Sequence, residues 1–149
     1  MPLLDETRKA AWSMLLVSRA RLVEKIDHEL AAANVVSFDW YDVLLWLEEA
    51  GGKLKMGELA DSVLTSRSGL TRLVDRMEAV GYVKREHCDQ DRRVVYAVLT
   101  DAGRAARVQA WTVYEPALVK HFARFLSEDD AITIHDALAR TLEETSPLT

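Results

Sequence analysis

A basic amphipathic segment that leads directly into two short apolar segments is the feature that most constrains the fold of this chain. Between residues 66 and 80, apolar side chains recur at spacings of three and four, the period of one face of an α-helix. They are Leu70, Leu73, Val74 and Met77. Because this stripe is expected to pack inward, the opposite face should meet solvent with Ser68, Thr71, Arg72 and Asp75.

The residues at the two ends of this helix predict where it begins and ends, and two predicted strands follow it. Ser66 is a good N-cap, and Gly81 can take the left-handed conformation that ends many helices. Residues 82–86 and 94–99 are rich in β-branched and aromatic side chains, and polar residues 87–93 separate them. A helix followed by such a hairpin is the outline of a winged helix-turn-helix.

The outer face of the helix and the tip of the hairpin carry residues typical of DNA contacts. Short polar groups at a helix start, with arginines along the same face, suit the major groove. We expect DNA contacts from Ser66, Arg67, Ser68, Thr71, Arg72 and Arg76. Arg92 and Arg93 at the tip can follow the phosphate backbone or enter a minor groove. The alternative is that both are solvated turn charges.

Residues 57–104 resemble the MarR family of bacterial transcription regulators. The resemblance rests on residues 58–60, on residues 71–76, on residues 81–83 and 91–93, and on Leu99, Thr100, Asp101 and Gly103. It implies that Asp91 orients a neighbouring arginine by a salt bridge, and that Arg92 or Arg93 contacts DNA. Two segments depart from the family pattern: residues 64–65 lack the common turn glycine, and residues 87–89 replace the Asp-Pro that commonly opens the wing.

The sequence predicts that the rest of the chain forms helices separated by short breaks. We expect helices over about residues 4–32, 39–50 and 55–63, a long helix from Thr100 to about Leu126 with a kink or break at Pro116, and a last helix capped by Ser127 with Asp130. The predicted fold is mostly α with a small β-wing. It forms one domain over residues 1–149, with a winged helix-turn-helix over 37–100 and dimerisation helices over 1–36 and 101–149.

The terminal helices carry apolar stripes that nothing else in the chain is expected to cover. A second copy would cover them, and a twofold dimer would place two recognition helices on one face of DNA. The resemblance implies the same interface. We therefore expect a homodimer that binds an inverted repeat, with a monomer closed by a conventional helical core as the alternative.

Net charge argues against DNA binding until its distribution is considered. The formal charge is −5, but residues 64–93 hold seven Lys or Arg against five Asp or Glu, a balance of +2. The remaining residues carry −7. An acidic body with a mildly basic edge predicts binding that weakens steeply with salt. Neither a membrane helix nor a signal peptide is expected, so the predicted location is cytoplasmic.

The resemblance implies that a small aromatic or phenolic acid acts as effector, because many regulators of this kind are released from DNA by one. The candidate contacts are Trp12, Arg19, Trp40 and Trp111, with Arg19 facing a carboxylate. For each of these residues we favour the alternative, in which the tryptophans are core or interface residues and Arg19 pairs with an acid across the dimer.

Other functions are weakly supported. Cys88 is the only cysteine, so an intrachain disulfide is excluded and a redox-responsive regulator would act through this one thiol. The scattered histidines predict no metal site, no motif predicts a cofactor, and no convergent catalytic set predicts an enzyme. A winged helix used only for protein interaction is the remaining alternative, which exposed aromatics on the recognition helix would favour.

Overall fold

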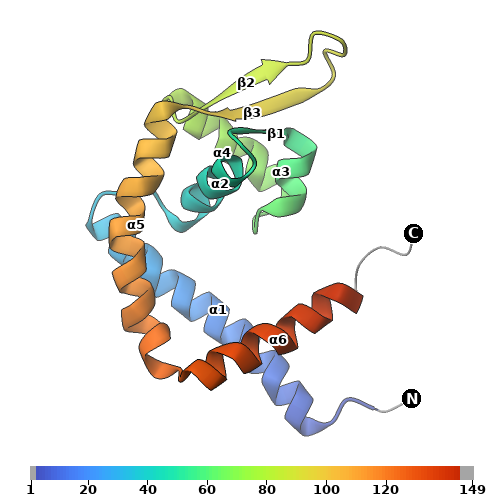
Figure 1. Ribbon diagram of the computed structural model, residues 1–149, viewed down its shortest axis with the longest axis vertical. Helices are drawn as coiled ribbons and strands as arrows, with labels where there is room; N and C mark the ends of the chain where they lie inside the picture. The colour runs from blue at the N-terminus through green and yellow to red at the C-terminus, as the bar shows by residue number, and fades with distance from the viewer. Residues whose placement is uncertain (1–2, 145–149) are drawn as a thin grey trace.

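The computed structural model describes residues 3–144, and Figure 1 shows a head of helices and strands joined to two further helices by one long helix. The helical segments are α1 (Glu6–Ala32), α2 (Phe38–Glu49), α3 (Met56–Ser62), α4 (Arg67–Ala79), α5 (Asp101–His121), the 3-10 turn η1 (Ala123–Phe125) and α6 (Glu128–Glu144). The strands are β1 (Lys53–Lys55), β2 (Val83–His87) and β3 (Val95–Leu99). The fold class predicted from the sequence, mostly helical with a β-wing, is confirmed.

The sheet has three antiparallel strands, one more than the sequence predicted. Its order is β1-β3-β2, with Leu54 and Arg85 both opposite Ala97 of the central strand. The prediction of two strands was wrong because β1 is only three residues long and carries two lysines, which favour strands weakly. Its strand conformation depends on pairing with β3, a contact between residues more than 40 positions apart.

The head is built around the inward stripe of α4. Leu70, Leu73, Val74 and Met77 are all buried, as predicted. They share one core with residues from α2, α3 and the sheet, including Val43, Leu44, Leu47, Leu59, Val83 and Ala97. Because every apolar position of the stripe is occupied in this core, α4 has one orientation in the head, with its polar face toward solvent.

Most helix ends agree with the capping residues predicted from the sequence. The Ser66 hydroxyl accepts the Gly69 amide hydrogen at 3.1 Å, and the Thr100 hydroxyl accepts that of Gly103 at 3.0 Å. Ser127 and Asp130 cap each other's amides in a reciprocal pair. Gly81 follows α4 with a φ of +84°, the left-handed conformation expected there.

The sequence predicted a kink or a break at Pro116 and a helix reaching Leu126; the helix does not break at Pro116, and it ends before Leu126. α5 continues through Pro116 and ends at His121, because Phe122 leaves the helical region with φ −133° and a short 3-10 turn follows. A proline removes one amide hydrogen bond from a helix. Here Tyr114 packs on Tyr41 and Ala117 is buried against α1, so packing on both sides of the proline holds the helix together.

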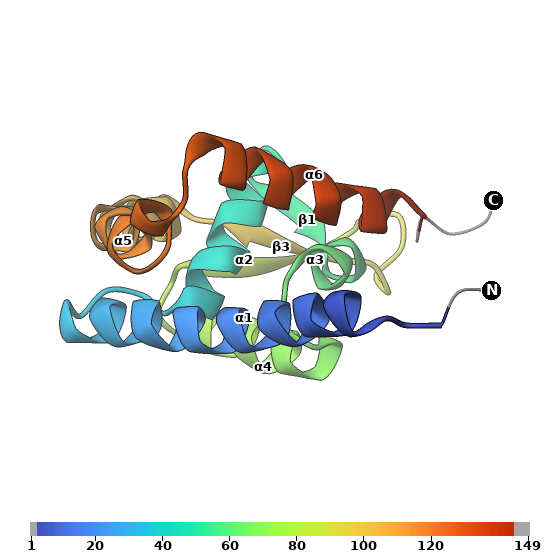
Figure 2. The ribbon, with the colours of Figure 1, turned by 90° about the horizontal axis from the view of Figure 1, so that it is seen from below.

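A second, smaller core joins α5 to α1, while α6 stands apart. Ile26 and Leu30 of α1 pack with Ala117 of α5. None of the described side chains of α6 is buried. Both α1 and α6 extend away from α5 toward the same side of the molecule (Figures 1 and 2). Within the described residues, no helix has the length and apolarity needed to cross a lipid bilayer.

The first turn of α5 packs so closely on Tyr82, between α4 and β2, that only glycine fits at position 103. A Cβ atom at Gly103 would collide with the backbone carbonyl oxygen of Tyr82. Gly103→Ala is therefore expected to lower the free energy of unfolding by about 1–3 kcal/mol, the usual cost of overpacking. The gain in helix propensity is smaller, about 1 kcal/mol or less.

Urea unfolding of the two proteins measures this difference. The control is Gly57→Ala in α3, where an added Cβ meets no atom within 4 Å. That variant should be as stable as the wild type or slightly more stable. Equal stability of the Gly103→Ala variant and the wild type would show that the joint between Tyr82 and α5 is looser than described.

Candidate nucleic-acid interface

The outer face of α4 is polar and holds two arginines without partners. Thr71, Arg72, Asp75 and Arg76 are exposed, opposite the buried stripe. The guanidinium groups of Arg72 and Arg76 make no hydrogen bond or ion pair with any residue in the range 3–144. They are thus charged donors available to a ligand.

The start of α4 is organised by local hydrogen bonds. Ser66 caps the helix, and the Ser68 hydroxyl lies 3.5 Å from the Ser66 hydroxyl. The Thr71 hydroxyl donates to the carbonyl oxygen of Arg67 at 3.3 Å. Arg67 differs from the other arginines of this helix, because its guanidinium pairs with Asp61 of α3. Its charge is therefore partly neutralised within the head.

The turn between α3 and α4 has no glycine and does not need one. Among the described non-glycine residues only Asn34 has a positive φ, so Leu64 and Thr65 adopt ordinary backbone conformations. The Asp42 carboxylate of α2 accepts the Leu64 amide hydrogen at 3.0 Å and holds the turn. Burial raises the pKa of Asp42, although the hydrogen bond from the Leu64 amide acts in the opposite direction. Sequence reasoning missed this residue, since its partner lies 22 positions away.

The wing is a tight hairpin in which Asp91 selects one of the two arginines. Its carboxylate accepts Nε of Arg93 at 3.1 Å and Nη2 at 3.3 Å, and it also accepts the Arg93 amide hydrogen. These bonds hold the pKa of Asp91 below its usual range. The Arg93 side chain is still 91% exposed. Arg92 has no side-chain partner within the part of the chain that the structure describes, so the two arginines are not equivalent.

A third arginine joins the wing to α4, and sequence reasoning did not identify it. Arg85 of β2 forms ion pairs with Asp75 at 2.8 Å and Glu78 at 3.1 Å, and its amide donates to Glu78 at 2.9 Å. The wing is thereby fixed to the recognition helix, and two acids on that helix are neutralised. A groove of about 680 Å³ runs between α3, α4 and the wing, and its lining includes the bases Lys55, Arg85 and Arg93 together with the acids Glu58 and Asp61.

The four candidate effector residues lie in different places. Trp12 is exposed on α1, and Trp40 packs edge-on against Tyr82 at a ring distance of 6.0 Å. Trp111 stacks on Tyr41 at 6.1 Å. Arg19 lies at a cleft of about 210 Å³ between α1 and α5, whose lining includes Phe38, Tyr114 and Phe122. Only Arg19 therefore combines a charge with an adjacent apolar cleft.

Cys88 is half-buried at the start of the wing tip, where its amide donates to the Val94 carbonyl oxygen at 3.0 Å. Residues 3–144 include no group of three or more His, Cys, Asp or Glu side chains that could hold a metal ion.

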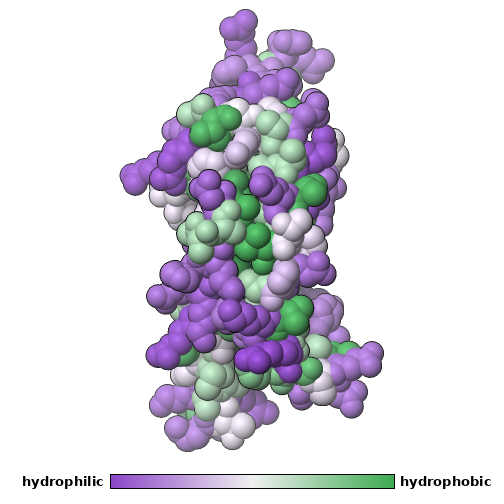
Figure 3. Space-filling view, turned by 90° about the vertical axis from the view of Figure 1, so that its left-hand side faces the viewer, coloured by the Kyte–Doolittle hydropathy of each residue, from purple (hydrophilic) through white to green (hydrophobic). Residues whose placement is uncertain are grey.

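The end of the molecule that carries the wing is strongly hydrophilic (Figure 3).

Comparison with known proteins extends these observations to the whole fold. A model of the MarR family matches residues 36–94. The HTH-type transcriptional repressor MdtR of Bacillus subtilis is 30% identical over 81 residues, which are 54% of this chain and 52% of the relative. The chain spans about half or less of the length of the curated relatives it matches.

Solved structures are similar over nearly the full length. AbsC, a MarR family transcriptional regulator from Streptomyces coelicolor, has a TM-score of 0.82 at 28% identity, with 97% of each chain covered. Sco3205 from the same organism, determined in complex with DNA, has a TM-score of 0.86 at 24% identity, with 99% of this chain and 92% of the other covered. Residues 36–94 therefore match the MarR family of winged helix-turn-helix transcription regulators, and the chain shares its fold with solved regulators of that family over nearly its full length.

Proposed function

We propose that this protein binds an inverted-repeat DNA duplex as a homodimer and represses transcription at that site. The observation that carries the proposal is the pair of unpartnered arginines, Arg72 and Arg76, on the outer face of a helix whose inner face is locked in the core. The described residues of that outer face include no aromatic side chain, which favours DNA over a protein partner. The DNA complex of Sco3205 and the repressor name of MdtR support the same function.

The homodimer is supported by the apolar surfaces of the terminal helices. A groove of about 420 Å³ between α1 and α6 is lined mainly by apolar side chains, among them Met14, Leu15, Ile134 and Leu138. Large exposed apolar surfaces are characteristic of protein interfaces. A second copy of the chain would cover them and, by twofold symmetry, would place the two α4 helices about one turn of DNA apart.

We also propose that a single-ring aromatic acid acts as effector at the cleft beside Arg19. The cleft has apolar walls and a cation at its edge, the combination that such a ligand needs. Trp40 packs in the head core and Trp111 on Tyr41, so we assign these two to packing rather than to ligand contact.

The experiment that tests the proposed function is selection of a duplex from a random-sequence pool by the wild-type protein. The expected result is an inverted repeat bound by two chains, with an affinity that falls steeply as salt rises, because each phosphate contact releases counterions. Light scattering without DNA should show a dimer. A monomeric protein that binds DNA with full affinity, or a pool that yields no preferred sequence, would contradict the proposal.

Arg72→Ala is expected to weaken binding to the selected duplex by about 1–3 kcal/mol if the arginine reads a base edge. The loss should be largest at one base pair in each half-site, and preference there should relax. Arg21→Ala is the matched control, since it removes the same charge from an exposed position on α1. Equal weakening by Arg72→Ala on every duplex sequence would assign Arg72 to a phosphate instead.

Asp91→Ala is expected to weaken binding even though it removes a negative charge, because Asp91 holds Arg93. Arg93→Ala should weaken binding too and should reduce the slope of log affinity against log salt by about 0.9. The two losses should not add in the double variant, since both remove one interaction. Asp91→Ala and Arg92→Ala should be additive, which makes Arg92 the control. Tighter binding by the Asp91→Ala variant would refute the positioning role.

A further inference from the structure

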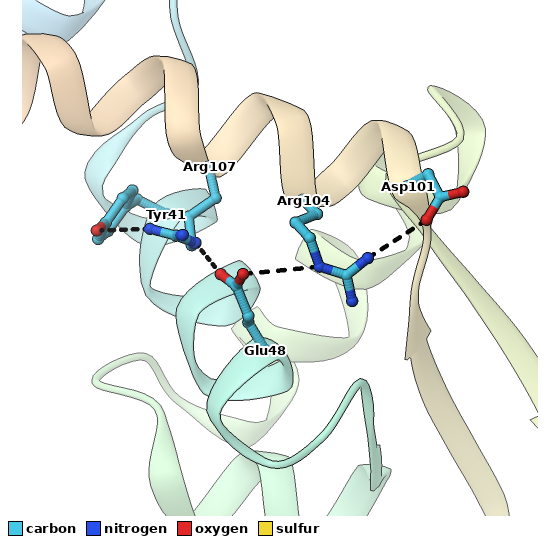
Figure 4. A network of polar contacts seen from close by, with 5 residues as sticks. All are labelled: Tyr41, Glu48, Asp101, Arg104 and Arg107. Atoms are coloured by element: carbon cyan, nitrogen blue, oxygen red, sulfur yellow. Dashed lines mark hydrogen bonds and ion pairs between the residues drawn. The ribbon is translucent and has the colours of Figure 1, made fainter.

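The head and α5 are joined by a polar network centred on one carboxylate. Glu48, in the last turn of α2, pairs with Nε of Arg107, and its other oxygen lies 3.6 Å from Nε of Arg104. Arg107 also donates to the Tyr41 hydroxyl at 3.5 Å, and Arg104 to Asp101 at 3.3 Å. Figure 4 shows Glu48 of α2 lying between the two arginines of α5.

Glu48 occupies a position where an acid is unfavourable unless it has partners. The C-terminal end of a helix carries a partial negative charge, and α2 has no basic residue in its last turn. Arg104 and Arg107, three residues apart on one side of α5, offset both the carboxylate and the helix end. Arg107 is only 18% exposed, so the loss of Glu48 would leave its charge half-buried and uncompensated.

The network lies where α5 passes from one core to the other. Ala106 belongs to the head core, Ala117 to the core shared with α1, and the packed rings of Tyr41 and Trp111 lie between them. α2 shares the head core with α4 and the sheet. A rotation of α2 against α5 would therefore move the recognition helix and the wing as one body.

We propose that Glu48 is a positioning residue for DNA binding. Arg104 and Arg107 hold it from two points along α5, which fixes the angle between the winged head and that helix. In the dimer this contact restricts the separation of the two recognition helices, and hence the half-site spacing that the protein accepts. The inference rests on the proposed function.

Cys88 provides a direct test, because it is the only cysteine and lies in the wing. A nitroxide attached to Cys88 reports the distance between the two wings of a dimer by pulsed electron resonance. The wild type should show a narrow distribution, and Glu48→Gln, which keeps the size but removes the charge, should broaden it. Glu49→Gln is the matched control, since the neighbouring acid is exposed and forms no ion pair with another residue among 3–144; its distribution should stay narrow.

Binding to DNA gives a second readout that loss of stability alone would not produce. On duplexes whose half-sites are moved apart or together by one base pair, the discrimination shown by the wild type should fall about fivefold in the Glu48→Gln variant. The penalty for a mismatched base within one half-site should not change. The exchange Glu48→Lys with Arg107→Glu should narrow the distribution only in part, because it re-forms the inner pair but leaves Arg104 facing a lysine. If Glu48→Gln does not fold, Arg104→Gln, which leaves the inner pair intact, should give an intermediate width.

The outcomes separate this inference from the function on which it rests. A dimer in which Glu48→Gln has the wild-type distance distribution and spacing preference would overturn the role of Glu48 and leave the proposed function intact. A wild-type protein that is a monomer by light scattering would overturn the dimer, and the inference with it.

Discussion

Burial of the apolar stripe of α4 is the constraint on which the recognition surface depends. Leu70, Leu73, Val74 and Met77 are packed against α2, α3 and the sheet, so the helix cannot turn about its axis without exposing them to water. Their burial determines that Arg72 and Arg76 face outward. Polar residues on the opposite face can therefore vary without affecting the core. The residues needed for folding and those needed for DNA recognition thus lie on different faces of the helix.

The elements that carry the recognition surface could be predicted from the sequence because their signals are local. Helical periodicity located α4, serine and threonine caps located its start and that of α5, and Gly81 located its end. The contacts between distant positions could not be predicted. Pairing of β1 with β3, the Asp42 carboxylate on the Leu64 amide, and the ion pairs of Arg85 each depend on how the chain packs.

The roles of the two wing arginines could not be predicted from the sequence either. Arg92 and Arg93 are adjacent and identical in type, so composition and spacing treat them alike. Only the hairpin backbone decides which guanidinium reaches the Asp91 carboxylate, and it brings Arg93 to both oxygens. For Pro116, the local signal was misleading, because packing of Tyr114 and Ala117 outweighed the missing amide hydrogen bond.

The exposed apolar face of α6 has a consequence for how much of the folded protein exists at a given concentration. None of its described side chains is fully buried within the chain, and an isolated helix of seventeen residues is marginal in water. If a second chain covers α6, its stability follows mass action and rises with the amount of protein present. A cell that makes few copies would then lose operator occupancy twice, through fewer chains and through a smaller fraction of them with α6 in place.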